Sequence, residues 1–114
     1  MAVKFIYCTF GSKADFEKMA EELLMQGLIA CANGWEIFSI YSDTPVEVVK
    51  LWKGKEYAGL FKTTERDYKK ACDYIIKNHK YKVPAVLVVD GVSMNKLYSK
   101  WLEEVCSRKE QDSI

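Results

Sequence analysis

The stretch from Lys62 to Val89 limits the possible folds more than any other part of the chain, because it combines a strand end, a helix, a corner and a buried strand. Thr64 is a suitable helix N-cap, and Asp67 stands where it can complete a short capping box. Residues of one helix face then recur at helical spacing: Tyr68, Ala71, Cys72, Ile75, Ile76 and His79. Pro84 prevents the helix from continuing, and the apolar run 85–89 is typical of a strand that is covered on both faces.

The chain before this stretch predicts a strand, a helix and a long extended segment. Residues 3–10 are apolar on both faces of a strand. Ser12 is the expected N-cap of the first helix, and Gly27 is its expected end. Residues 28–41 read as extended, and the pair 33–34, Asn-Gly, suggests a bulge or kink in that segment.

Two further strands and a last helix complete the expected elements. Residues 42–45 predict a turn, and residues 46–52 and 57–63 predict two strand arms around the Lys-Gly-Lys segment 53–55. Ser93 is the expected N-cap of the C-terminal helix. The apolar stripe of this helix is Met94, Leu97, Tyr98, Trp101, Leu102 and Val105.

The element order is β-α-β-β-α-β followed by a helix, which predicts an α+β fold of the ferredoxin-like split βαβ type with an extended β-hairpin. We expect one domain over residues 1–106 and a polar, frayed tail over residues 107–114. The fold leaves one face of its sheet open, and strands that are apolar on both faces need a cover there. A partner subunit is the simplest cover.

Composition narrows the classes of function. The net charge is +1, which gives no electrostatic reason to expect a nucleic acid or an anionic membrane as partner. No apolar run approaches the length of a membrane span, and the N-terminal residues show no secretory pattern. The four cysteines are widely spaced without a C-x-x-C pair, which favours reduced thiols in a cytoplasmic protein.

Several short blocks between residues 3 and 105 resemble, in their order, those of the CutA family, small trimeric proteins named for divalent-cation tolerance. The blocks are Cys8-Thr9, Ala30-Cys31-Ala32-Asn33, Ser39-Ile40-Tyr41, Trp52-Lys53-Gly54-Lys55, Glu56 with Lys62-Thr63, His79-Lys80-Tyr81-Lys82-Val83-Pro84, and Tyr98 with Trp101-Leu102. Their conjunction carries the resemblance, since no single block is specific. It implies a homotrimer, a role in divalent metal tolerance and no catalysis.

The sequence departs from the family pattern at three places. Lys80 replaces the proline after the histidine, and Ala85 replaces the glutamate after Pro84. The segment between Tyr41 and Trp52 is longer than the usual connection. The missing glutamate removes a carboxylate from the metal site that the resemblance implies near the histidine block. Copper should therefore bind more weakly here than in relatives that keep the glutamate.

Cys8 and His79 are the candidate metal ligands. The resemblance implies copper binding by the cysteine of the Cys-Thr block and by the histidine region, and thiolate with imidazole is a donor set that suits copper. The alternatives are that His79 is a capping histidine at a helix end and that Cys8 is a small buried hydrophobe. No closely spaced ligand pairs of a structural zinc site are present in the sequence.

Five aromatic residues admit two explanations, and two further function classes lack the sequence features that they require. Tyr41, Trp52, Tyr57, Tyr81 and Trp101 are of the kind that line pockets and subunit interfaces, although ordinary core packing explains them as well. An RNA-recognition module shares the element order, but its aromatic strand motif is absent. An acylphosphatase would need an arginine after the first strand, and residues 10–13 contain none.

We therefore expect a non-enzymatic, cytoplasmic homotrimer that is involved in divalent metal tolerance and requires no cofactor, with copper as a possible ligand of Cys8 and His79. No nucleic acid and no membrane are expected as partners. The alternative is a PII-like signalling or scaffold trimer that binds a small molecule and has no metal role.

Overall fold

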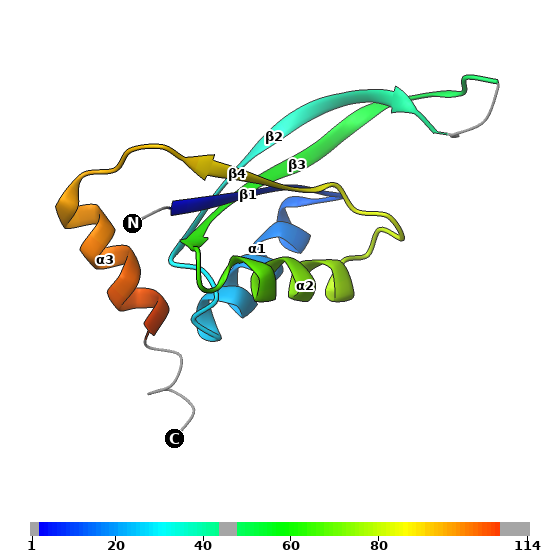
Figure 1. The fold of residues 1–114 in the computed structure, drawn as a ribbon. Coiled ribbons are helices and arrows are strands. Elements are labelled where there is room, and N and C mark those ends of the chain that lie inside the picture. Colours follow the sequence, from blue (N-terminus) through cyan, green and yellow to red (C-terminus); the bar gives the residue numbers. More distant parts are fainter. Residues whose placement is uncertain (1–2, 44–47, 108–114) are drawn as a thin grey trace.

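The protein forms a four-stranded antiparallel sheet with helices packed against it (Figure 1). The computed structural model describes residues 3–43 and 48–107. The elements, in chain order, are β1 (Val3–Phe10), α1 (Lys13–Met25), β2 (Cys31–Ser42), β3 (Leu51–Thr64), α2 (Tyr68–Asn78), β4 (Val86–Gly91) and α3 (Lys96–Ser107). The strand order is β2-β3-β1-β4, and α1 and α2 lie on one face. This confirms the predicted ferredoxin-like α+β arrangement.

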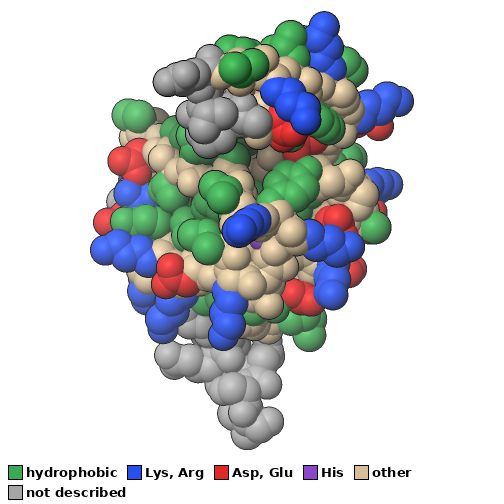
Figure 2. All heavy atoms as spheres, turned by 90° about the vertical axis from the view of Figure 1, so that its right-hand side faces the viewer, with side chains coloured by type: hydrophobic (Ala, Val, Ile, Leu, Met, Phe, Trp, Pro, Cys, Tyr) green, Lys and Arg blue, Asp and Glu red, His purple; other side chains and the backbone are tan. Residues whose placement is uncertain are grey.

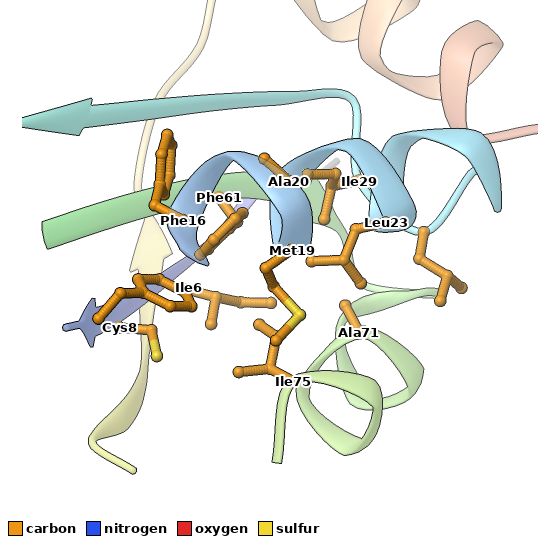
Figure 3. Packing of buried hydrophobic residues seen from close by; sticks show 12 residues of the cluster. Ile6, Cys8, Phe16, Met19, Ala20, Leu23, Ile29, Phe61, Ala71 and Ile75 are labelled. Carbon is orange, nitrogen blue, oxygen red and sulfur yellow. The ribbon is translucent and has the colours of Figure 1, made fainter. Parts of the chain in front are cut away.

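The main core lies between the sheet and helices α1 and α2 (Figure 3). β1 supplies Ile6, Cys8 and Phe10, which point to the same face because side chains alternate along a strand. The other buried members come from the helices, from β3 and from the segment after α1: Phe16, Met19, Ala20, Leu23, Leu28, Ile29, Phe61, Ala71 and Ile75. Each large apolar side chain buried in this layer contributes roughly 1.5–3 kcal/mol to stability.

The limits of α1 follow from local signals. The Ser12 hydroxyl accepts a hydrogen bond from the Asp15 N–H at 3.1 Å, as expected of an N-cap. Gly27 has a φ of 68°, a left-handed conformation that other residues adopt at a cost. The Leu28 N–H then donates to the Leu23 carbonyl at 3.0 Å, which closes the helix end. Both predicted ends of α1 are confirmed.

The start of α2 lies later in the chain than predicted. Thr64 is the last residue of β3, and Asp67 is the N-cap of a helix that begins at Tyr68. The predicted pairing of the two residues is nevertheless present. The Asp67 N–H donates to the Thr64 hydroxyl at 3.1 Å, and that hydroxyl donates to the Asp67 carboxylate at 3.0 Å. The exchange therefore stabilises the turn that precedes the helix.

β2 and β3 form one long hairpin in an unbroken register, from Cys31 opposite Lys62 to Ser42 opposite Leu51. The predicted bulge at residues 33–34 is therefore wrong. The prediction of separate strand arms around residues 53–55 is also wrong, because β3 runs straight through that segment. The predicted turn over 42–45 and the start of the predicted strand at 46 fall partly outside the described residues.

The two glycines that suggested breaks serve close packing instead. A Cβ atom on Gly34 would lie 2.6 Å from the Phe16 ring, and a Cβ atom on Gly54 would lie 2.8 Å from the Trp52 ring. Both distances are too short for a side chain to be accommodated without a shift. Glycine is required at these positions because aromatic rings lie directly over the strand.

α3 covers the end of the sheet at which β1 begins (Figure 1). The Tyr98 N–H donates to the Asn95 side chain at 2.8 Å, so Asn95 and not Ser93 caps this helix. Leu102 and Cys106 are fully buried. Leu97 is 84% exposed and does not belong to the buried stripe. The rest of the predicted tail, from residue 108, lies outside the described residues.

β4 is an edge strand, and it is less covered than its apolar sequence suggested. Leu87 and Val89 are each 53% exposed, so the expectation of a strand covered on both faces is wrong for the single chain. On the sheet face opposite α1 and α2, Leu87 neighbours Tyr7, and Trp35 of β2 is also exposed.

In the described residues, no helix has the length and apolar character needed to cross a membrane.

Candidate functional site

His79 follows the last residue of α2 and packs against the end of β1. Its Nε2 lies 2.8 Å from the carbonyl oxygen of Thr9, and its Nδ1 lies 2.9 Å from the backbone nitrogen of Tyr81. A carbonyl only accepts and an N–H only donates, so the two contacts fit the tautomer that carries its proton on Nε2. The ring stacks on Phe10 with centroids 4.8 Å apart. Both ring nitrogens are thus hydrogen-bonded.

Cys8 lies on β1 and is fully buried in the main core. Its Sγ donates to the Thr9 carbonyl oxygen at 3.5 Å. Burial, together with the nearby Cys72 and Glu56, raises the pKa of the Cys8 thiol to about 12. The thiol is therefore protonated at neutral pH, whereas the thiolate is the form that binds metals.

The fold brings the two predicted ligands together. Cys8 Sγ and His79 Nε2 both hydrogen-bond to the carbonyl oxygen of Thr9, although 70 residues separate Thr9 from His79 in the chain. Within residues 3–43 and 48–107 no cluster of three or more His, Cys, Asp or Glu side chains could hold a metal ion. Cys8 and His79 thus bring two potential donor atoms close together, and the described residues supply no third ligating side chain.

A pocket of about 460 Å³ opens beside Thr9, between the α2–β4 connection and the hairpin. It is lined by Thr9, Ser39, Ile40, Tyr41, Glu56, Tyr81, Val83 and Ala85. The polar centre of the pocket is Glu56, which is only 8% exposed. Its Oε2 accepts a hydrogen bond from the Tyr81 hydroxyl at 2.6 Å.

Burial and the carboxylate of Glu56 both raise the pKa of Tyr81, so the phenol stays protonated and neutral at physiological pH. Burial raises the pKa of Tyr41 as well. The Tyr81 ring also lies against the His79 ring, with centroids 4.7 Å apart. The pocket and the Cys8–His79 pair are therefore neighbours that share Thr9 and are joined through Tyr81.

Three of the five aromatic residues that were expected to line a pocket or interface gather at this place. Tyr41 and Tyr81 line the pocket, and Trp52 stacks on Tyr41 with centroids 4.9 Å apart. Tyr57 and Trp101 pack elsewhere, against Phe16 in the core and against a neighbour on α3. Tyr41, Trp52 and Tyr81 therefore belong to the pocket, whereas Tyr57 and Trp101 serve packing.

The sequence alone indicates no role for Glu56 beyond its place in a family block. One signal was available. Glu56 lies on the same face of β3 as Ala58 and Leu60, so it places a charge beside two apolar side chains. A carboxylate beside apolar side chains either faces solvent or is buried with a hydrogen-bond partner. Glu56 is buried, and Tyr81 is its partner.

Lys80, which replaces a proline of the family pattern, has a structural partner. Its ammonium group lies 2.9 Å from the carboxylate of Asp15 in the first turn of α1. Lys80 lowers the pKa of that carboxyl. The pair borders a smaller hollow of about 160 Å³ between α1 and α2, which His79 also lines.

Comparisons with known proteins agree on one family. The model of the CutA1 divalent ion tolerance protein family matches residues 4–105. The divalent-cation tolerance protein CutA of Thermotoga maritima is 34% identical over 104 residues, which cover 87% of this chain and 94% of that protein. The CutA of Pyrococcus horikoshii is also 34% identical, and the match covers 87% of this chain and 93% of that protein.

Solved structures agree with these matches. A crystal structure of the Pyrococcus horikoshii CutA, obtained in 3 M guanidine hydrochloride, has a TM-score of 0.83 at 33% identity and covers 90% of this chain and 97% of that one. The CutA of Archaeoglobus fulgidus, described as a periplasmic divalent cation tolerance protein, has a TM-score of 0.83 at 26% identity and covers 91% and 98%. The chain belongs to the CutA family of divalent-cation tolerance proteins.

Proposed function

We propose that the protein acts in divalent metal tolerance as a non-catalytic CutA homotrimer that binds copper through Cys8 and His79. The observation that carries the copper proposal is the convergence of Cys8 Sγ and His79 Nε2 on the Thr9 carbonyl oxygen. Thiolate suits Cu(I), imidazole suits both oxidation states of copper, and copper stands at the top of the divalent affinity order. No other metal and no required cofactor are part of the proposal.

Copper binding by Cys8 and His79 carries a free-energy cost, which lowers the affinity. The Cys8 thiol must lose a proton although its pKa is about 12, and His79 must give up the Nε2 proton or the hydrogen bond at Nδ1. Ala85 supplies no carboxylate to complete the coordination. Because metal binding displaces protons, the affinity rises with pH.

Calorimetric titration with copper tests this site. The wild type, His79→Ala and Cys8→Ala should be compared at a pH where imidazole is neutral. The matched control is Cys31→Ser, because Cys31 is a half-buried thiol whose Sγ contacts Asn33 instead of Thr9. We expect both site variants to lose affinity at least tenfold and the control to bind as the wild type does. If both site variants bind copper like the wild type, the site lies elsewhere or does not exist.

The homotrimer is supported by the uncovered parts of the sheet. β2 and β4 are both edge strands, and Leu87, Val89 and Trp35 are about half exposed in the single chain. Exposed apolar edges promote pairing with another chain unless they are covered. Sedimentation at micromolar concentration decides the point, because a folded monomer of 13.2 kDa would contradict the proposal.

The absence of catalysis and the cytoplasmic location are further parts of the proposal. Neither Cys8, as a protonated thiol, nor His79, with both nitrogens hydrogen-bonded, is prepared to act as nucleophile or base. All four cysteines are free thiols, which suits a reducing compartment. The Archaeoglobus fulgidus relative is described as periplasmic, so cell fractionation is the test of location.

A second candidate is a PII-like signalling or scaffold trimer that binds a small molecule and has no metal role. The pocket beside Glu56 favours it, since about 460 Å³ is within the size range of small-molecule sites. Copper titration separates the two candidates. A wild-type protein that binds no copper under any tested condition would leave only the second.

A further inference from the structure

A groove runs between helices α1 and α2, on the side of the molecule that faces away from the open face of the sheet. Leu23 and Ala71 lie between the two helices at its base (Figure 3). α1 contacts β1, β2 and β3, and α2 contacts β1 and β4, so the groove follows the middle of the helical layer. The proposed subunit contacts use the open sheet face and the sheet edges. The groove is therefore accessible in the homotrimer as well as in the single chain.

Where α1 ends, the groove widens into a hollow of about 380 Å³, a volume within the range of small-molecule sites. Its lining residues are Gln26, Leu28, Lys70, Asp73, Tyr74 and Lys77. Leu28 belongs to the main core, and Tyr74 is half-buried against that core. These two side chains give the hollow an apolar floor, whereas the three charged side chains are exposed and form its rim.

Tyr74 is held in place before any ligand arrives. Its hydroxyl donates to the carboxylate of Glu22 on α1 at 2.7 Å, so the side chain spans the groove. That hydrogen bond, together with burial, raises the pKa of Tyr74, and the phenol stays neutral at physiological pH. Because the hydroxyl is committed to Glu22, the ring offers mainly carbon surface to the hollow. A fixed wall lowers the entropy cost of binding.

The rim of the hollow carries an excess of positive charge. Lys70, Asp73 and Lys77 are three, four and seven residues apart, so they lie on one side of α2. Among the described residues, no carboxylate lies within ion-pair distance of Lys70 or Lys77. Two ammonium groups thus stand beside a single carboxylate. In Figure 2, which looks onto the end where α2 stops, lysine or arginine side chains project from the lower half of the molecule.

The neighbouring hollow of about 160 Å³ differs in this respect. Its lysine at position 80 is paired with Asp15, and its Glu22 accepts the hydrogen bond from Tyr74. The larger hollow therefore offers uncompensated positive charge next to an apolar floor. A metal ion would be repelled by the two ammonium groups and would find only one carboxylate. A nucleic acid needs many phosphate contacts, which two lysines do not supply. Charge complementarity favours a small organic anion.

We propose that this hollow binds an organic monocarboxylate with an apolar body. Its carboxylate lies between the ammonium groups of Lys70 and Lys77, and its apolar body lies against Leu28 and Tyr74. Seven residues span about 10 Å along a helix, a distance that two long lysine side chains can bridge from both sides of one carboxylate. This role goes beyond copper binding, because it uses none of the proposed metal ligands and no subunit contact.

The test is a titration of the full, metal-free chain with n-hexanoate in a dilute Tris chloride buffer at neutral pH. Hexanamide is the matched neutral probe, since it has the same length without the charge. Binding is followed by the backbone amide resonances of residues 26, 28, 70, 73, 74 and 77. We expect saturable shifts at these residues with hexanoate and at least threefold weaker binding of hexanamide. Equal binding of the two probes, or no saturation with hexanoate, overturns the proposal.

Three variants complete the test, and all of the substituted side chains are exposed, so the core stays intact. The double variant Lys70→Gln with Lys77→Gln should weaken hexanoate binding about tenfold, whereas Asp73→Asn should strengthen it about twofold. The control is Lys69→Gln, because Lys69 is an exposed lysine of α2 that does not line the hollow, and it should change the affinity less than twofold. Wild-type affinity in the double variant, weaker binding in Asp73→Asn, or an equal loss in the control would contradict the assignment.

Discussion

The two ends of β1 differ in how completely their polar groups are paired. At the Val3 end, the hydroxyl of Thr63 donates to the Leu28 carbonyl at 2.6 Å, and Asp67 is buried with hydrogen bonds from Thr64 and Arg66. At the Phe10 end, Glu56 is nearly as buried but has only a neutral phenol as partner among the described residues. The first end has the features of a stabilising cap, and the second has the features of a binding site.

This difference shows why burial alone does not identify a functional carboxylate. Asp67 and Glu56 are both buried, at 1% and 8% exposure. The guanidinium of Arg66 lies 3.1 Å from Asp67, whereas none of the described residues that line the space beside Glu56 is a lysine or arginine. A paired buried charge supports the fold, and an unpaired one keeps a cost that a ligand can remove. Substitutions at the two ends should therefore differ in their effect on stability.

The largest effect is expected from the apolar part of the Val3 end. Leu102→Ala removes a fully buried side chain that packs with Val3, Ala30 and Cys106, and it should lower the free energy of unfolding by about 2–5 kcal/mol. Leu97→Ala on the same helix is the matched control, because Leu97 is 84% exposed, and its effect should stay within about 0.5 kcal/mol. Denaturant unfolding at one fixed protein concentration measures both. Equal losses would show that α3 does not close this end.

The polar part of the Val3 end should give the next effect. Asp67→Asn keeps the shape but removes the charge that faces Arg66, and it leaves an amide N–H₂ in a buried position. We expect a loss of about 1–3 kcal/mol in the free energy of unfolding. A neutral effect on stability would show that the Thr64–Asp67–Arg66 group is dispensable.

At the Phe10 end, Tyr81 should produce a smaller, pH-dependent effect. Burial and Glu56 raise its pKa, so the folded state holds the phenolic proton more tightly than the unfolded state. Its contribution to stability is therefore present below about pH 10, the ordinary tyrosine pKa, and is lost as the pH rises through the raised value. Between about pH 9 and pH 12, the free energy of unfolding should fall less steeply with rising pH for Tyr81→Phe than for the wild type. Identical curves would contradict the raised pKa.

Local signals predicted most of the fold. Ser12, Gly27 and the Thr64–Asp67 pair act through neighbours in the sequence, so their roles could be read from spacing. The hairpin could not be read in this way. Gly34 and Gly54 were interpreted as breaks, whereas they make room for rings, and the ring over Gly34 comes from Phe16, far away in the chain.

The candidate site was predicted only in part for the same reason. Cys8 and His79 were named from a resemblance, and the structure places both against the Thr9 carbonyl. The pocket was not foreseen, because Glu56 becomes buried only when Tyr81, which lies 25 residues further along the chain, folds over it. A charge in a strand sequence otherwise reads as a solvent-facing residue. Contacts between distant segments are what a single sequence does not display.

The free energy of unfolding of Glu56→Gln, measured in parallel with Asp67→Asn without ligand and at one protein concentration, tests the central claim most directly. The glutamine side-chain oxygen can still accept the hydrogen bond from Tyr81, and the substitution removes a charge for which the described residues offer no cationic partner. We expect Glu56→Gln to change stability by less than about 0.5 kcal/mol or to increase it, while Asp67→Asn loses about 1–3 kcal/mol. Equal losses in both variants would contradict the claim that Glu56 is kept for binding and not for folding.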